Sequence, residues 1–347
     1  MGNSVFPWQI DDWRRLRQLA ARLPHALLFH GAEGIGKTCF AEAFAQALLC
    51  QAPDAEGHAC GTCASCGWFA QGNHPDYRCV RPEALEAADD DEAADEDGKK
   101  GAKSKTPSKD IRIDQIRALA DFMNISTHRR GVRVVLLYPA EALNAPAANA
   151  LLKTLEEPPP DTVFLLVTHN PDRLLPTILS RCRKFALALP APDAALAWLR
   201  QQGVAAADAE MWLAEQGGAP LAARALAEGG EREAMEEFLR QLAQPGVDGA
   251  LKAAEKLQKV PLPEQVAWLQ RWLYDLFALK LAGRVRYYPR YRKELAALAG
   301  RAEAGALAQA IKSAGERAAV AAHPLSPRLF IEDMLIEYST IFSDSRA

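Results

Sequence analysis

A glycine-rich segment near the N-terminus has the residues and the spacing of a phosphate-binding loop. Residues 31–38 read Gly-Ala-Glu-Gly-Ile-Gly-Lys-Thr, which matches the pattern G-x-x-x-x-G-K-[ST]. Gly31, Gly34 and Gly36 would let the backbone curl so that its N–H groups face phosphate oxygens. Lys37 would reach the β- and γ-phosphates, and Thr38 would hold Mg²⁺ through its hydroxyl. The segment therefore predicts a site for ATP or ADP with Mg²⁺.

Hydrolysis of a nucleotide needs more than this loop. A carboxylate at the end of another strand holds Mg²⁺, and commonly an adjacent carboxylate positions water. The candidate strand, residues 132–137, is a nearly continuous apolar run, but Tyr138 and Pro139 follow it where an Asp-Glu pair would stand. Glu141 is the next carboxylate, and its position favours a helix start over a metal ligand. We therefore expect little or no ATPase activity, while the intact loop leaves nucleotide binding open.

Four of the seven cysteines lie close together in the sequence, at Cys50, Cys60, Cys63 and Cys66. In a chain without a secretory signal, grouped cysteines are more often metal ligands than disulfides. The two C-x₂-C steps let short turns bring thiolates to one tetrahedral centre, and Cys50 can supply the fourth ligand. The spacing predicts a structural zinc site. It also resembles part of an iron–sulfur pattern, but the x₃-Cys-Pro continuation of that pattern is missing.

These residues need a parallel sheet to position them. Residues 26–30 form a short apolar run of strand character directly before the loop, and an amphipathic helical segment, residues 39–50, follows it. Residues 149–157 have a helical apolar face and end at a run of prolines, and residues 163–167 are a further strand candidate. Strands that alternate with helices in this way predict an α/β domain.

The segment after the second strand candidate carries a specific resemblance. Residues 149–160 read Asn-Ala-Leu-Leu-Lys-Thr-Leu-Glu-Glu-Pro-Pro-Pro, and Ser180-Arg181-Cys182 closes a run that begins at Thr177. With the phosphate loop and the cysteine module, these motifs resemble the clamp-loader branch of the AAA+ ATPases over roughly residues 8–189, and more loosely beyond. The resemblance implies an α/β P-loop AAA+ domain, a parallel sheet flanked by helices, with a zinc module. A small helical lid and an all-α collar domain would follow it.

The departures from the family pattern point to one kind of subunit. The family's motor subunits, gamma and tau, carry Asp-Glu where this chain has Tyr138 and Pro139. They also carry a sensing arginine in the lid where this chain has Pro220. The polar sensor after the second strand would be Thr168 or His169.

Arg181, in contrast, is retained with its whole motif. The resemblance implies that it acts in trans as an arginine finger at the nucleotide of a neighbouring motor subunit, where negative charge accumulates on the γ-phosphoryl oxygens. The implied role is that of a largely non-hydrolysing subunit. It would assemble with gamma or tau and delta in a hetero-pentamer that loads the sliding beta clamp on primed DNA in the cytoplasm. A surface salt bridge is the alternative reading of Arg181.

The composition is that of an ordinary globular chain. It has 347 residues, of which 49% are hydrophobic and 24% charged, which argues against a collagen-like repeat, whole-chain disorder or a disulfide mini-scaffold. No apolar run approaches the roughly 18 residues of a membrane-spanning helix. The net charge of −3 is local, because residues 83–109 carry nine acidic and five basic side chains and the rest of the chain carries +1. We expect a disordered charged insertion there.

We expect three domains. Residues 1–189 would be the nucleotide-type domain, with the zinc module at 50–66 and the insertion at 83–109. The lid would span residues 190–230, and a helical collar or oligomerisation domain residues 231–347. Helices are predicted there at about 231–243, 249–258, 263–282, 292–299 and 327–342, and Trp268 and Trp272 recur at the spacing of a buried helix face.

Two other functions remain open at this point. An ATP-hydrolysing motor subunit would use the same loop, although it would lack the two acids after the second strand. An independent zinc-containing DNA-binding protein would use the basic and aromatic group between residues 280 and 293. The alternative interpretation of this group is a solvated face at a subunit interface, and the net charge does not decide between the two because it is set by residues 83–109.

Overall fold

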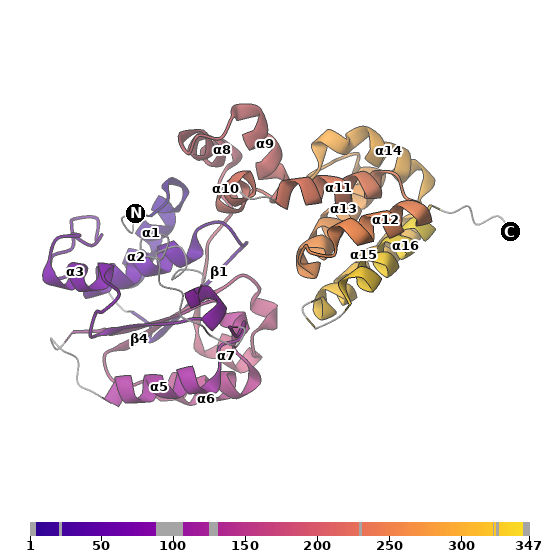
Figure 1. The fold of residues 1–347 in the computed structure, drawn as a ribbon. Coiled ribbons are helices and arrows are strands. Elements are labelled where there is room, and N and C mark those ends of the chain that lie inside the picture. The colour runs from indigo at the N-terminus through magenta and orange to yellow at the C-terminus, as the bar shows by residue number, and fades with distance from the viewer. Residues whose placement is uncertain are drawn as a thin grey trace, which may run out of the picture. The chain divides into compact units, whose positions relative to one another are not determined.

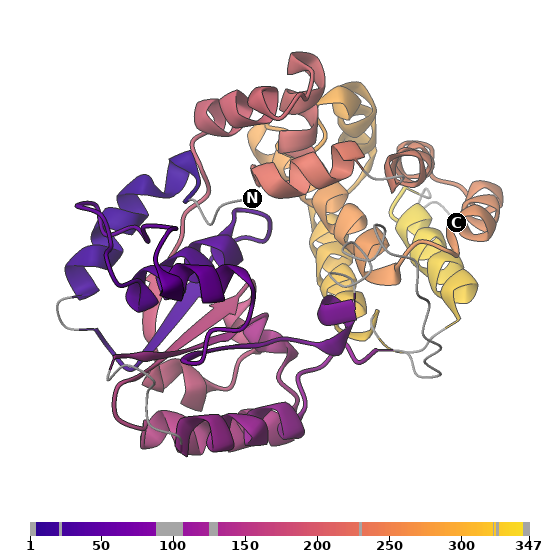
Figure 2. The ribbon, with the colours of Figure 1, turned by 60° about the vertical axis from the view of Figure 1, so that its left-hand side comes forward.

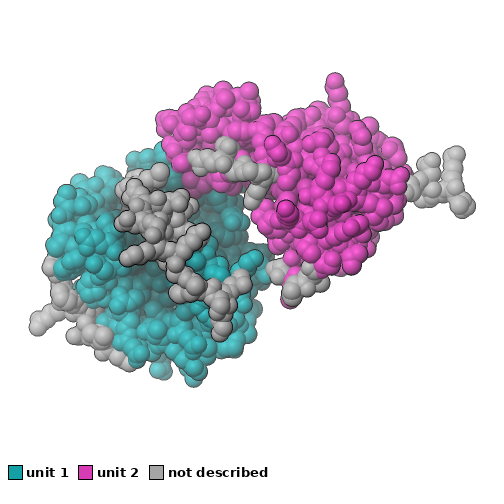
Figure 3. Space-filling model, in the orientation of Figure 1, with its two compact units in different colours: residues 1–191 teal, residues 192–347 magenta. Residues whose placement is uncertain are grey.

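The computed structural model describes residues 5–20, 23–87, 107–124, 131–228, 231–321, 323 and 326–342. The chain divides into two compact units, Met1–Ala191 and Pro192–Ala347 (Figure 3). Within the described residues, every strand belongs to the first unit. None of the described helices is long and apolar enough to cross a membrane.

Five parallel strands form the sheet of the first unit, in the order β2-β3-β4-β1-β5. They are β1 (Ala26–His30), β2 (Tyr77–Val80), β3 (Arg133–Leu137), β4 (Thr162–Thr168) and β5 (Arg183–Ala186). Their register places His30 beside Thr168 and Leu137 beside Leu166, so the carboxyl ends of β1, β4 and β3 meet at one edge. Open α/β sheets bind their ligands at this edge.

Helices cover both faces of the sheet (Figures 1 and 2). On one face lie α1 (Ile10–Ala20) and α2 (Lys37–Leu49), where Trp13 and Phe40 pack edge to face and Phe40 contacts Phe29 of β1. On the other face lie α5 (Ile113–Asn124), α6 (Ala145–Glu156) and α7 (Pro176–Arg181), which bury Leu28 and Leu166 of the sheet. The central strands are therefore apolar on both sides, as buried parallel strands require.

The strands expected from the sequence at residues 26–30, 132–137 and 163–167 are confirmed as β1, β3 and β4. β2 and β5 were not expected, because each has only four residues and a mixed pattern of burial. β4 lies between β1 and β3, so the end of β3 is two strands away from the phosphate loop.

The described residues of the second unit form helices joined by loops, without a strand. It begins with α8 (Pro192–Gln201), α9 (Ala206–Glu215) and α10 (Pro220–Glu228). Six further helices follow: α11 (Glu231–Ala243), α12 (Val247–Leu257), α13 (Leu262–Ala282), α14 (Arg292–Arg301), α15 (Ala304–Val320) and α16 (Pro327–Thr340). Trp268 and Trp272 of α13 are buried, and the indole Nε1 of Trp272 donates to the hydroxyl of Tyr338 at 2.8 Å. The interpretation of the tryptophans as core residues is confirmed.

The charged insertion is narrower than the sequence suggested. Residues 83–87 are helical, the backbone N–H of Ser108 donates to the carboxylate of Glu83 at 3.2 Å, and Glu83 also pairs with Arg112. The prediction of disorder was therefore wrong for residues 83–87 and 107–109, at the two ends of the predicted insertion. Residues 88–106 lie outside the described residues. The division into three domains stays a prediction, since the compact units separate between residues 191 and 192.

Candidate functional site

The loop between β1 and α2 has the backbone of an anion cradle. Gly34 and Gly36 have φ angles of 75° and 86°, a region that side-chain-bearing residues rarely adopt. Gly36 is also the N-cap residue of α2. The N–H groups of these two glycines donate to no acceptor within the described residues. Free N–H groups at the start of a helix are suited to binding phosphate oxygens.

The N-terminal segment fixes the carbonyl side of this loop. The indole Nε1 of Trp8 donates to the carbonyl of Ile35 at 3.1 Å, and Nε2 of Gln9 donates to the carbonyls of Ile35 and Gly36 at 3.0 and 3.1 Å. A Cβ atom on Gly36 would lie 2.5 Å from the ring of Phe6, so only glycine fits there. The three hydrogen bonds join residues 26 to 27 positions apart, and nothing in the sequence signals them.

Lys37 lies inside the loop rather than on its surface. Its side chain is buried, and its Nζ donates to the carbonyl of Ala32 at 2.5 Å. Burial lowers the pKa of Lys37 to about 8, although the carboxylates of Glu33 and Glu141 act in the opposite direction. Thr38 follows in the first turn of α2. With the free N–H groups, this donor set fits the phosphate chain of a nucleotide.

No carboxylate directly follows β3. The hydroxyl of Tyr138 accepts a hydrogen bond of 3.1 Å from Nη1 of Arg81, and burial raises the pKa of the Tyr138 phenol. Pro139 comes next and begins a short 3-10 helix as its N-cap residue. Neither side chain can supply the negative oxygen that a magnesium ion needs.

The nearest carboxylate, that of Glu141, instead bridges two strand ends. It lies in the 3-10 helix η2 (Ala140–Ala142), and its Oε1 accepts the backbone N–H groups of His169 at 2.8 Å and Asn170 at 3.3 Å. Glu141 lies in the first turn of a helix, as the sequence predicted. Its hydrogen bonds to the turn after β4 could not be predicted from the sequence. Its second oxygen, Oε2, is buried without a hydrogen-bond partner within the described residues.

The same turn contains both candidates for the polar sensor. Thr168 is fully buried, and its hydroxyl accepts the N–H of Asn170 at 3.1 Å. The Nδ1 atom of His169 is buried and bonds to no described group. The pKa of His169 is lowered by burial and then by the charge of Lys37. The Thr168 hydroxyl accepts this bond and keeps its own O–H as a donor, so both residues stay candidates for the sensor.

Arg181 is the last residue of α7, and its guanidinium is held between two helix ends. Nη2 lies 2.5 Å from Oε1 of Glu156, at the end of α6. Nη1 donates to the carbonyl of Thr177 at 2.9 Å and to the hydroxyl of Ser180 at 3.3 Å. The arginine side chain is 32% exposed.

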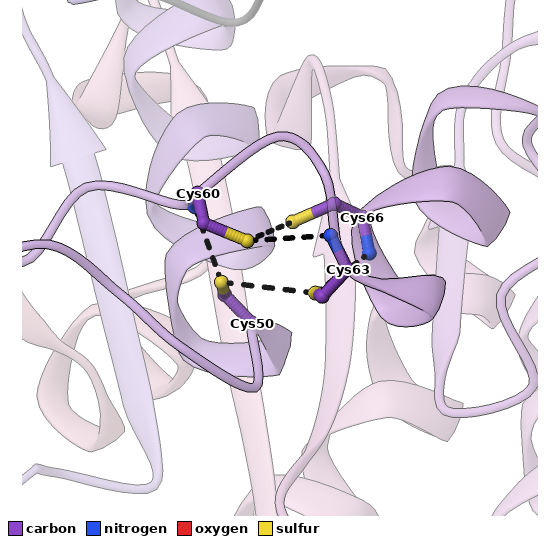
Figure 4. A group of neighbouring side chains, drawn as sticks. All are labelled: Cys50, Cys60, Cys63 and Cys66. Atoms are coloured by element: carbon purple, nitrogen blue, oxygen red, sulfur yellow. Dashed lines mark hydrogen bonds between the residues drawn. The ribbon is translucent and has the colours of Figure 1, made fainter.

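The four clustered cysteines meet at one point (Figure 4). Their sulfurs all lie within 4.8 Å of one another, and the pairs Cys50–Cys63 and Cys60–Cys66 are separated by 4.0 Å. Tetrahedral zinc with bonds of about 2.3 Å spaces its sulfur ligands by about 3.8 Å. The four cysteines are therefore close enough to hold one metal ion.

Local structure presents these thiols to a common centre. Cys50 follows the last residue of α2, and Cys63 is the N-cap residue of α3 (Ala64–Ala70). Hydrogen bonds from the backbone N–H groups of Thr62 and Cys63 lower the pKa of the Cys60 thiol to about 6, which favours the thiolate that a metal needs. All seven cysteines are free of disulfides.

Two histidines near the cysteines in the sequence have other contacts. The ring of His58 stacks on Trp13 with centroids 4.4 Å apart. Nε2 of His74 hydrogen-bonds with the hydroxyl of Ser65 at 2.8 Å, and its Nδ1 accepts the N–H of Asp76 at 3.0 Å. The candidate ligand set is thus four thiolates.

The parallel sheet and the phosphate loop after β1 define an α/β P-loop domain, which carries a cysteine module and is followed by a helical second unit. A family described as DNA polymerase III, delta subunit, matches residues 11–190. DNA polymerase III subunit delta' of Pseudomonas aeruginosa is 41% identical over 80% of this chain and 79% of the relative. Its Escherichia coli counterpart is 35% identical over 78% and 75%. DNA polymerase III subunit tau of Bacillus subtilis is 31% identical over 62% of this chain and 33% of that protein. The chain therefore belongs to the DNA polymerase III subunit delta' family.

Proposed function

We propose that this chain is an assembly subunit of the DNA polymerase III clamp loader, with gamma or tau and delta as its neighbours in a hetero-pentamer. The complex would place the sliding beta clamp on primed DNA in the cytoplasm. The delta' relatives, matched over about four fifths of the chain, support this role, and the similarity to a tau subunit supports a shared complex. Because Tyr138 and Pro139 stand where the hydrolytic acids would be, the chain itself hydrolyses little or no ATP.

The observation that carries the proposal is the partly exposed side chain of Arg181 at the end of α7. The chain keeps this cation although its own strand end lacks the acids for hydrolysis. A planar, permanently charged fork is suited to the oxygens of a transferring phosphoryl group. Arg181 therefore acts in trans, on a nucleotide held by a neighbouring motor subunit.

Two bound groups belong to the same proposal. The loop of Gly31, Gly34, Gly36, Lys37 and Thr38 holds the phosphate chain of ATP or ADP, with Mg²⁺ on the Thr38 hydroxyl. The free N–H groups and the buried Lys37 support this assignment.

Zinc on Cys50, Cys60, Cys63 and Cys66 is structural, since four protein ligands leave no open coordination position. It would tie the end of α2 to the start of α3. The distances among the four sulfurs support this assignment.

The test is a reconstituted complex with gamma or tau, delta and the clamp, in which Arg181→Ala is compared with the unmodified chain. A trans arginine raises the hydrolysis rate at the site it serves by about 10³-fold or more. The clamp- and DNA-stimulated ATPase rate of the complex should therefore fall by the fraction that this one site contributes. Arg117→Ala is the matched control, because Arg117 lies on α5 with a side chain that is 70% exposed. Intact assembly with an unchanged ATPase rate in Arg181→Ala would refute the trans role.

A further inference from the structure

The contact between Glu156 and Arg181 joins two helices that are themselves firmly placed. α6 is anchored by Leu151 and Leu155, which are fully buried against the sheet, and α7 is anchored by Ile178 in the same core. Glu156 is the last residue of α6 and Arg181 the last residue of α7. Their backbone positions are therefore fixed by the core, and only the side chains can vary.

The bonds of the guanidinium hold it in one orientation. Nη2 meets the carboxylate of Glu156, while Nη1 is bound by the carbonyl of Thr177 and the hydroxyl of Ser180. A guanidinium carries five N–H donors, so at least two are left for another acceptor. The carboxylate thus restrains one side of the fork and leaves donors for phosphate oxygens.

This restraint has an energetic consequence for a finger. A free arginine side chain has many rotamers, and part of this entropy is lost when it binds phosphate. A side chain that is already oriented loses less on binding, and correct orientation of a catalytic group lowers the barrier. The pair itself contributes little to folding, because ion pairs between partly exposed side chains are weak. Glu156 and Arg181 are 49% and 32% exposed.

We propose that Glu156 is a positioning residue, which orients the guanidinium of Arg181 for the γ-phosphate of the nucleotide on the neighbouring subunit. The proposal rests on the trans role of Arg181. It assigns to Glu156 at the end of α6 a function that the Ser180-Arg181-Cys182 motif alone does not contain. Glu157, the next residue, is exposed and is the matched control.

The experiment uses the complete reconstituted complex and compares Glu156→Ala, Glu156→Gln and Glu157→Ala. We expect Glu156→Ala to lower kcat of the stimulated ATPase by up to about fivefold at the site served, which corresponds to about 1 kcal/mol of transition-state stabilisation. The KM for ATP stays unchanged, because the motor subunit binds the nucleotide. Glu156→Gln keeps a hydrogen-bond acceptor and recovers part of the rate, and Glu157→Ala has no effect.

A double-mutant comparison separates positioning from a general structural effect. In an Arg181→Ala background, Glu156→Ala should lower the rate no further, because a positioning residue acts only through its partner. A rate that is unchanged or higher in Glu156→Ala alone would overturn the proposal, as would an additive loss in the double variant. If Arg181→Ala itself has no effect, the trans role fails, and that result is distinct from a failure of Glu156 alone.

Discussion

The carboxylate of Glu141 accepts the backbone N–H of His169 at 2.8 Å and so joins the ends of β3 and β4. The same oxygen accepts the N–H of Asn170 at 3.3 Å. β3 has lost the acids that would serve a magnesium ion, yet the carboxylate three residues after Tyr138 is used in the fold. Its contact shapes the turn that carries both candidates for the polar sensor, Thr168 and His169.

Removal of this carboxylate should destabilise the turn after β4. Glu141→Ala leaves two backbone donors without their acceptor, which costs about 1 to 3 kcal/mol. Glu141→Gln keeps an acceptor oxygen and should cost less. Urea unfolding and the hydrogen exchange of the amides of His169 and Asn170 measure both effects. Asp172→Ala, an exposed carboxylate in the next turn, is the control, and an equal loss in that variant would contradict the bridging role.

Nucleotide affinity should depend on pH through Lys37. Its pKa is lowered to about 8 by burial, so the ammonium is charged below that pH and becomes neutral above it. Affinity for ATP or ADP should therefore be constant near pH 7 and fall as pH rises through 8, by up to about tenfold per pH unit. Titration calorimetry from pH 6.5 to 9.5 measures this dependence.

Two variants control that experiment. Lys37→Arg keeps its charge over the whole range, so the dependence on pH between 8 and 9.5 should disappear. Lys37→Ala should lose most of the affinity at every pH. Equal affinity in Lys37→Ala and the unmodified chain would show that the loop is not the nucleotide site.

The local part of this architecture could be predicted from the sequence, and the long-range part could not. β1, the loop and α2 follow each other directly, so the apolar run and the glycines suffice to place them. α15 was not expected, because Ala304–Val320 is rich in alanine and has only Leu307 and Ala314 fully buried. Such a helix packs through small side chains, which leaves a weak apolar period.

The contacts that complete the candidate site were hidden for a related reason. Glu141 reaches His169 over 28 positions, and Glu156 reaches Arg181 over 25. A carboxylate at the start or end of a helix is common for local reasons, so its type and position do not reveal a distant partner. The cysteine cluster could be predicted from the sequence, because three of its four candidate ligands lie within seven residues at the start of α3.

Loss of the metal should unfold the cysteine module. Cys60→Ser should lower the zinc content from one ion per chain and lower Tm, because structural zinc contributes directly to folding. Elemental analysis of freshly prepared protein, before and after a chelator, measures the ion. Cys39→Ser is the control, since Cys39 is exposed on α2 and lies outside the cluster. Iron, or no metal in the unmodified chain, would contradict the zinc assignment.

The stability of the second unit should fall as pH rises from about 4.5 to about 7, because of Glu215. This carboxyl at the end of α9 is 1% exposed, and burial raises its pKa to about 7 despite Arg290, whose Nη2 lies 3.4 Å away. The folded state therefore holds a proton that the unfolded chain releases near pH 4.5. This contribution is complete below pH 4.5 and is lost as pH rises to about 7.

Glu215→Gln tests this dependence, because a glutamine remains neutral at every pH. Between pH 5 and 8 the unfolding free energy of the unmodified chain should fall by about 2 kcal/mol relative to that of Glu215→Gln. Urea unfolding of the full chain, with hydrogen exchange in α9 and α11 as the local readout, measures the difference. Glu210→Gln, an exposed position on the same helix, should keep the dependence of the unmodified chain. Parallel pH profiles for Glu215→Gln and the unmodified chain would contradict this prediction, because they would mean that Arg290 keeps Glu215 ionised. Arg290 also pairs with Glu236, whose Oε1 lies 3.1 Å from its Nη1.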